Sequence, residues 1–305
     1  MKTALRIAAS GLLVGLLFWA TDPVAAAARL AGADPVWLAL AGLALTAQTV
    51  LMAFRWRLTA GRLGLRIGRR RAVGEYYLAQ VVNMTLPGGV VGDAARAVRS
   101  RDGTGLARAA LAVMIERLAG QIALFALAAI GFAAAFATPG GLLWPAGGPV
   151  VLAIALGIAT LAPLSIRRLA PGVWRPLRRA LTARRVWPRQ AALGLVIAIL
   201  NLSAFAACAR ATGTALGVEA VFTIVPLVLT AMLIPLSVAG WGWREGAAAA
   251  LFPLAGADPA AGVAASVAFG LVLLAISLPG LLWPILAPAR SGALTQGHGP
   301  ETPVQ

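Results

Sequence analysis

The chain has almost none of the residues on which disulfides, metal sites and catalytic triads depend. It contains one cysteine, Cys208, and one histidine, His298. A single thiol excludes an intramolecular disulfide, and a single imidazole nearly excludes a histidine-based metal site or triad. Acidic residues are also scarce, 10 against 26 basic ones, and every basic residue except Lys2 is an arginine. We therefore expect no metal and no cofactor.

What the chain has in abundance is apolar sequence. Hydrophobic residues make up 60% of its 305 residues, charged residues only 12%, and the mean hydropathy is +0.85. Such a composition cannot cover the surface of a globular domain in water, so it predicts an all-α polytopic membrane protein. The net charge of +16 lies in short loops between apolar runs. That pattern is typical of loops held in the cytoplasm and in contact with anionic lipids, and it does not favour nucleic acid as a partner.

Six apolar runs are predicted to cross the membrane, at residues 7–20, 35–54, 109–137, 150–166, 191–209 and 261–286. The first run also has the features of a secretory signal peptide, although we prefer a retained helix. Residues 1–290 are predicted to form the membrane domain, and residues 291–305 a disordered polar tail.

Two loops are rich in arginine and contain no acid, residues 55–71 and 167–189. Both are predicted to be cytoplasmic, as are the two termini, while residues 210–219 are predicted to lie outside. The first loop is either a simple orienting loop or an amphipathic surface helix. In the second case its apolar side chains would dip into the membrane: Trp56, Leu58, Leu63, Leu65 and Ile67.

Two apolar segments are interrupted by proline and glycine in the same pattern. The first is YYLAQVVNMTLPGGVVGDAARAVR at residues 76–99, and the second is MLIPLSVAGWGWREG at residues 232–246. The matched positions are Pro87 with Pro235, Val90 with Val238, Gly92 with Gly240, and Arg96 with Arg244. Paired broken segments in two halves of a chain indicate the binding site of a transporter.

The first broken segment is predicted to be a re-entrant hairpin that starts and ends at the cytoplasm. If residues 220–254 form a second hairpin, that hairpin enters from outside, opposite to the first. The two hairpins then form an inverted pseudo-repeat. The predicted fold has about six to eight transmembrane helices, including both broken segments. The alternative is that residues 220–254 cross the membrane twice.

Several charged side chains fall within sequence at membrane depth, where charges persist mainly when paired or functional. Asp93 and Arg96 have the spacing of an ion pair on one helical face. Glu116 and Arg117 are adjacent and cannot face each other, so we expect Glu116 to reach Arg96 and Arg117 to reach Asp93. Arg244 and Glu245 are likewise expected to turn to different partners.

These residues also predict a phosphate site, because glycine backbone N–H groups and arginines are suited to an anion. The predicted head-group residues are Asn83, Gly88, Gly89, Gly92, Asp93, Arg96, Glu116, Arg117, Ser237, Gly240, Arg244 and Glu245, with helix breaks at Pro87, Pro235 and Gly246. A wholly structural role, in which they hold the two hairpins together, is the alternative. Tyr76 is interpreted as an interfacial aromatic residue, and Trp241 and Trp243 as candidates for lining a substrate path.

The two broken segments, together with LAVMIERLAG at residues 111–120, resemble the signature blocks of the lysylphosphatidylglycerol synthase transmembrane family, whose members are described as flippase-like. The resemblance implies a bundle in the bacterial inner membrane that moves or presents a lipid. Multidomain relatives add a soluble aminoacyl transferase, which this chain is expected to lack, so synthase activity is not expected.

The leading functional hypothesis is a lipid flippase or translocase for an anionic phospholipid or glycolipid phosphate, and not an enzyme. No GxxxxGK[ST] loop is present, so transport would be downhill or driven by an ion gradient, with Asp93, Glu116 and Glu245 as candidate proton carriers. One alternative is a membrane subunit of a lipid-modifying enzyme. Another is a scaffold that binds a glycosyltransferase through the arginine-rich loops.

Overall fold

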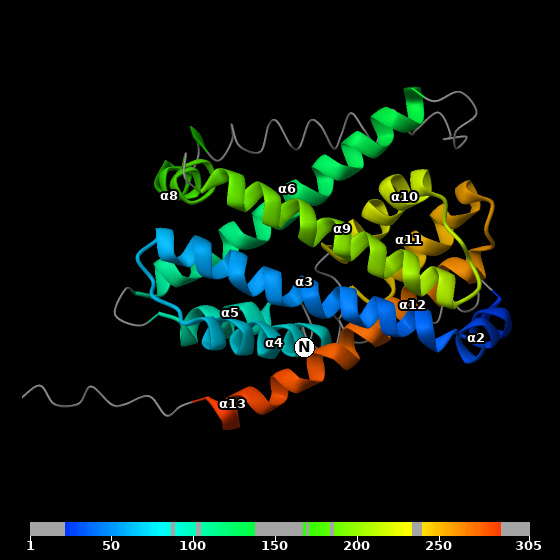
Figure 1. Cartoon of the computed structure of the whole chain (residues 1–305), viewed down its shortest axis with the longest axis horizontal. Coiled ribbons are helices and arrows are strands. Elements are labelled where there is room, and N and C mark those ends of the chain that lie inside the picture. The colour runs from blue at the N-terminus through cyan, green and yellow to red at the C-terminus, as the bar shows by residue number, and fades with distance from the viewer. Residues whose placement is uncertain are drawn as a thin grey trace, which may run out of the picture.

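The structure is a computed structural model that describes residues 22–86, 89–101, 105–137, 167–168, 171–183, 186–233 and 240–287. Over these residues the regular secondary structure is helical (Figure 1), which confirms the predicted all-α fold. The longer helices are α2 (Pro23–Ala31), α3 (Pro35–Arg62), α4 (Arg69–Thr85), α5 (Val91–Arg99), α6 (Leu106–Ala137), α8 (Pro171–Thr182), α9 (Trp187–Ala211), α10 (Val218–Thr230), α11 (Trp243–Leu251) and α12 (Pro259–Ser277). The shorter ones are η1 (Ala231–Leu233), η2 (Phe252–Ala255), η3 (Leu278–Leu282) and α13 (Trp283–Leu286).

Within the described residues, four stretches are long and apolar enough to span a membrane. They are α3, α6, α9 and the continuous stretch Pro259–Leu286, and each is longer than the roughly 20 residues that a crossing needs. Four of the six predicted spans are confirmed as helices of this kind. The other two, residues 7–20 and 150–166, lie outside the described residues, as does the predicted tail.

The end of α3 differs from the prediction. The predicted span stops at residue 54, whereas the helix continues to Arg62, and Arg55 and Trp56 are completely buried. Residues 65–68 follow as irregular chain, in which Leu65 and Ile67 are buried against the protein. Neither alternative, simple loop or surface helix, describes residues 55–62, which continue α3. The surface helix is wrong because Trp56, Leu65 and Ile67 are buried in the protein, whereas Leu58 and Leu63 are half-buried.

Helices α3 and α9 pack antiparallel to each other. The backbone N–H of Asp34, just before α3, donates to the carbonyl of Ala211 at the end of α9 (2.9 Å). At the other end, Gln190 Nε2 donates to Thr59 Oγ1 (3.0 Å). The end of α3 and the start of α9 therefore lie together.

Arg57, Arg62, Arg66 and Arg189 lie at this same end, called the basic end, because they belong to the end of α3, the chain after it and the start of α9. Helix α8 buries Leu177 and Ala180 against Ile115 of α6, so it packs on the protein at the end where α6 begins. At the opposite end, Arg29 of α2 pairs with Asp258 ahead of α12 (3.2 Å). Figure 1 shows α8 and α13 toward one end of the molecule and α2 at the other.

Helices α4 and α5 form a closely packed pair that begins and ends at the basic end. Their closest approach is at Gly92, where an added Cβ would lie 2.1 Å from the carbonyl oxygen of Ala79. Arg71 near the start of α4 donates to the carbonyl of Arg99 at the end of α5. Arg99 also pairs with Glu75 (2.6 Å), so the two free ends of the pair are held together.

Helices α10 and α11 are the two arms of the second broken segment. Gly240 and Gly242 have positive φ values of 80° and 90°, a conformation that side chains with a Cβ rarely adopt. The helix then restarts at Trp243. Gly246, predicted to mark the break, lies inside α11, and its N–H donates to the carbonyl of Gly242 (2.9 Å).

The largest apolar core lies among α3, α9, α10 and α12. Phe205 of α9 stands at its centre and contacts the rings of Phe252 and Phe269, with ring centroids 6.4 and 5.4 Å away. Cys208 is buried in the same core, where it packs as a small apolar residue.

Candidate functional site

Five charged side chains meet where the first hairpin, formed by α4 and α5, packs against α3 and α6. They are called the central charge cluster: Arg55, Asp93, Arg96, Glu116 and Arg117. They come from α3, α5 and α6, and three positive charges face two negative ones. Asp93 pairs with Arg96 one turn later at 2.9 Å, and also with Arg117 of α6. The predicted helical pair and the predicted contact between Arg117 and Asp93 are both confirmed.

Glu116 is the most connected member of the cluster. Its carboxylate accepts from Arg55 Nη2 at 2.8 Å and lies 3.6 Å from Arg96 Nη2, which confirms the predicted pairing of Glu116 with Arg96. Tyr76 of α4 donates its hydroxyl to the same carboxylate, at 3.2 and 3.3 Å. The interpretation of Tyr76 as an interfacial residue is therefore wrong: the ring is buried, and its hydroxyl satisfies a buried acid.

Arg96 is enclosed by aromatic rings. Its guanidinium carbon lies 4.5 Å from the ring centroid of Trp56 and 4.3 Å from that of Tyr76. Both distances are within the range of cation–π attraction. Arg96 is completely buried, so its position ties α5 to α3 and α4.

Asn83 joins the two arms of the first hairpin. Its Oδ1 accepts the backbone N–H of Gly92 (2.7 Å), and its Nδ2 donates to Asp93 Oδ2 (3.2 Å). The N–H of Gly92 was predicted to face an anion. It is occupied within the protein instead, and Gly92 serves to bring α5 against α4.

A second charge cluster lies at the start of α11. Arg244 pairs with Glu245 at 2.6 Å, and both contact Ser266 of α12 at 2.8 Å. The expectation that these neighbours turn to different partners is wrong. Glu245 also accepts the N–H of Gly242 (2.7 Å), so its carboxylate folds back over the helix start, where Arg244 can reach it.

Arg244 is completely buried. It lies 5.1 Å from the ring centroid of Trp241 and 5.5 Å from that of Phe269. An added Cβ on Gly270 would be 2.4 Å from Arg244 Nη2, so this glycine provides the space that the guanidinium occupies.

A cavity of about 270 Å³ lies between the two broken segments and is called the central cavity. Residues near both breaks line it, including Asn83 and Gly89 on one side and Met232 and Leu233 on the other. Its polar lining includes Arg55, Asp93, Glu116, Arg117, Gln48, Gln80, Gln121 and Asn201. Arg96, Gly240, Arg244 and Glu245 are not among its lining residues in the described part of the chain.

Arg55 and Arg117 are the arginines that line the central cavity. The side chain of Arg117 is 48% exposed, and that of Arg55 is fully buried. Within the described residues, Arg55 Nε and Nη1 have no hydrogen-bond partner. A buried guanidinium with unsatisfied donors adds positive charge at the wall of the cavity, which favours an anion there.

Four predicted residues lie outside the described part of the chain: Pro87, Gly88, Pro235 and Ser237. Gly89 lies beside the first break with a positive φ of 61°, a conformation that glycine adopts without steric cost.

The sequence did not indicate that Arg55 and Ser266 belong to the charge clusters, or that the Tyr76 hydroxyl donates to Glu116 inside the bundle. Arg55 was assigned to a cytoplasmic loop because it opens an arginine-rich run. The signal that would have found it is helical spacing, since Gln48, Arg55 and Thr59 fall on one face of α3 and all three are buried. A polar face that continues past the apolar run indicates a helix that extends beyond it.

Comparison with curated proteins found no match. Residues 3–280 match the family model described as the lysylphosphatidylglycerol synthase TM region, which covers nearly the whole chain. The chain is therefore a multi-pass membrane protein that belongs to the lysylphosphatidylglycerol synthase transmembrane-region family.

Proposed function

We propose that the chain is a lipid flippase or translocase that takes the head group of an anionic phospholipid or lipid-linked phosphate into the central cavity. The observation that carries the proposal is the cavity itself, which lies between the two broken segments and is lined by Arg55 and Arg117. Its volume of about 270 Å³ is near the lower end for ligand pockets, about 300 Å³. It therefore suits a head group better than a whole lipid, and the acyl chains would remain in the bilayer.

The charge balance of the central charge cluster favours an anionic ligand. With three arginines and two carboxylates, a bound phosphate would neutralise the excess positive charge. Arg117 can reach such a ligand because nearly half of its side chain is exposed. The side-chain amide of Asn83, which is held in place by the backbone N–H of Gly92, also lines the central cavity. Arg96 and Arg244 would act by holding the helices that shape the cavity.

The helix pairs support re-entrant hairpins of opposite direction. Helix α5 has nine residues, about 14 Å of helix, which is too short to cross roughly 30 Å of hydrocarbon. The α4–α5 pair begins and ends at the basic end, and α11 leads to α12 at the opposite end. Such an arrangement is an inverted pseudo-repeat, in which tilting of one hairpin against the other would open the cavity to each leaflet in turn.

The energy source is proposed to be a lipid gradient or a proton gradient. Glu116 and Asp93 are the carboxylates that line the central cavity, so they are better placed to carry protons than Glu245, which lies outside its lining. The membrane is proposed to be the bacterial inner membrane, with the basic end and both termini in the cytoplasm.

The test is transbilayer movement of labelled lipids in proteoliposomes. Labelled phosphatidylglycerol, an undecaprenyl-linked sugar phosphate and phosphatidylcholine are compared for the native chain, Arg117→Gln and Arg117→Lys. The proposal predicts that an anionic lipid moves faster than phosphatidylcholine, that Arg117→Gln slows it at least about tenfold, and that Arg117→Lys retains part of the rate. Arg29→Gln is the matched control, because it removes a partly exposed arginine far from the cavity. If no lipid moves under any imposed gradient, the proposal fails.

The basic end favours one alternative function, a scaffold for a lipid-modifying enzyme or glycosyltransferase. Exposed arginines cluster there on α3, α8 and α9. Replacement of Arg175 and Arg108 by glutamine should abolish function on the scaffold hypothesis and leave transport unchanged on the flippase hypothesis. Testing whether the double variant restores growth of a deletion strain, alongside the proteoliposome assay, separates the scaffold hypothesis from the flippase hypothesis.

A further inference from the structure

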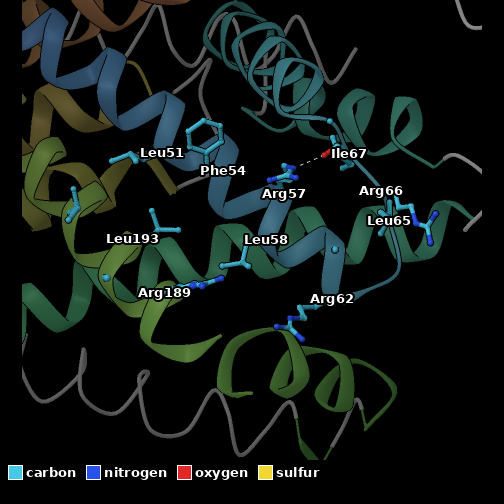
Figure 2. Close-up of a pocket in the computed structure, with 14 residues that line it drawn as sticks. Leu51, Phe54, Arg57, Leu58, Arg62, Leu65, Arg66, Ile67, Arg189 and Leu193 are labelled. Carbon is cyan, nitrogen blue, oxygen red and sulfur yellow. Dashed lines mark hydrogen bonds between the residues drawn. The ribbon is translucent and has the colours of Figure 1, made fainter. Parts of the chain in front are cut away.

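A large groove lies at the basic end, on a different face of α3 from the central cavity. It has a volume of about 960 Å³ and is lined by α3, the irregular chain after it, and the start of α9. Among the residues that the structure describes, none lines both sites. The groove is called the arginine groove, and Figure 2 shows the side chains around it.

One end of the groove carries arginines among apolar residues such as Leu65 and Ile67, and the other end is apolar. Its charged lining residues are Arg57, Arg62, Arg66 and Arg189, and none of the acidic side chains in the described part of the chain lines it. Its apolar lining residues include Leu51, Phe54, Leu58, Leu193 and Val196. Figure 2 shows Leu51 and Leu193 toward the middle of α3 and α9, and Arg62 and Arg66 at the end of α3 and in the chain that follows.

The depth of the groove matches one leaflet of a membrane. The twelve residues from Leu51 to Arg62 span about 16 Å of helix, close to half of the roughly 30 Å hydrocarbon thickness. The apolar end therefore lies at the depth of acyl chains, and the arginines lie at the level of the head groups. A soluble phosphate would use only the basic end, whereas a lipid would use both.

One arginine is already fixed in place. Arg57 Nε donates to the carbonyl of Ile67 (2.8 Å), drawn as the dashed line in Figure 2. This contact holds the guanidinium against the chain after α3 and leaves its terminal nitrogens available. Arg62, Arg66 and Arg189 are exposed around it.

We propose that the arginine groove binds one anionic phospholipid of the cytoplasmic leaflet, with its phosphate on the arginines and an acyl chain along Leu51, Leu193 and Val196. The lipid stays in its leaflet and joins the start of α9 to the end of α3. The inference does not depend on the proposed function, since it concerns a separate site and requires no transport.

The test is lipid binding to the full chain by native mass spectrometry in detergent, with phosphatidylglycerol and phosphatidylcholine of identical acyl chains as probes. We expect the native chain to retain one phosphatidylglycerol at least about tenfold more tightly than phosphatidylcholine. Arg62→Gln with Arg189→Gln should remove that preference. The control, Arg108→Gln with Arg175→Gln, removes two exposed arginines of the same end that do not line the groove, and it should retain the preference.

A second pair of variants tests the apolar end without changing charge. Val196 lines the groove and is 45% exposed, and its neighbour Leu195 is 46% exposed and does not line it. Val196→Trp should reduce retention of both lipids, and Leu195→Trp should not. The proposal is overturned if the native chain shows no preference for phosphatidylglycerol, if the control arginine pair loses it equally, or if the two tryptophan variants behave alike.

Discussion

At the scale of the residue, Glu116 is the side chain on which the buried charges depend most. It faces Arg55 and Arg96 and accepts from Tyr76, and its own side chain is fully buried. Taking charges out of water is costly and is offset only when pairing and hydrogen bonding are nearly complete. The central charge cluster therefore stabilises the fold only as a unit.

Glu116→Gln should be strongly destabilising, because Arg55 and Arg96 would lose their shared counter-charge. The expected loss of unfolding free energy is about 3–5 kcal/mol, measured by denaturation of the purified protein in detergent. The exposed pair of Arg29 and Asp258 gives the contrast, and Asp258→Asn should cost less than about 1 kcal/mol.

The double variant Arg55→Gln with Glu116→Gln tests whether the loss of stability in Glu116→Gln comes from an uncompensated buried charge. It should be less destabilised than Glu116→Gln alone, because the uncompensated charge is removed with its partner. Equal or additive losses would mean that the pair does not act as a unit.

Residue spacing predicted part of this site. The contacts of Glu116 with Arg96 and of Arg117 with Asp93 followed from adjacency, because neighbours on one helix diverge and must find other partners. The same argument was wrong for Arg244 and Glu245, where the carboxylate turns back over the helix start to Gly242. That geometry depends on the positive φ of Gly242, which the sequence alone does not specify.

At the scale of the element, close contact between the arms of the first hairpin depends on Gly92. The added Cβ of any other residue would meet the backbone of Ala79. Backbone atoms cannot rotate away as a flexible side chain can, so α5 would have to move, and Asp93 and Arg96 would move with it.

Gly92→Ala should therefore lower the unfolding free energy by about 1–3 kcal/mol and loosen the cluster. Gly61→Ala is the control: Gly61 is a helical glycine of α3 with nothing within 4 Å of its added Cβ, and this change should be neutral or slightly stabilising. Thermal unfolding of the two variants side by side makes the measurement. Similar stability of both would contradict the close packing of α4 on α5.

The breaks themselves were predictable, but the helix limits around them were not. Proline and glycine in an apolar run indicate an interruption, as seen at Gly240 and Gly242. The prediction of a break at Gly246 was wrong because, in sequence, a glycine inside a short helix looks the same as a glycine that interrupts one. The limit of α3 was misread because a buried, paired arginine looks like a loop arginine in sequence.

At the scale of the whole molecule, the distribution of arginines defines the two ends. The chain after α3, the start of α6, α8 and the start of α9 all carry basic residues and lie at one end. The turn from α9 to α10 lies at the other. The arginine content of the loops was enough to predict this organisation, because the positive-inside argument uses loop charge alone and requires no knowledge of how the helices pack.

Thiol labelling tests this orientation. In a Cys208→Ser background, Arg66→Cys and Ala215→Cys each place one thiol at an exposed position. A membrane-impermeant maleimide added to intact spheroplasts should label the second variant and spare the first until the membrane is opened. The reverse pattern would contradict the proposed orientation.

If the proposed function is correct, lipid head groups move through the central cavity. Asn201 of α9 lines it and is half-buried, whereas Ser203 of the same helix is exposed and does not line it. Asn201→Trp would fill much of the space, and Ser203→Trp would add the same ring on the outer surface.

The most direct measurement is therefore the rate of transbilayer movement in proteoliposomes for the native chain and these two tryptophan variants, each first shown to be folded. We expect Asn201→Trp to abolish movement of the anionic lipid and Ser203→Trp to move it at the native rate. A folded Asn201→Trp protein that still moves lipid at the native rate would contradict passage of the head group through the central cavity.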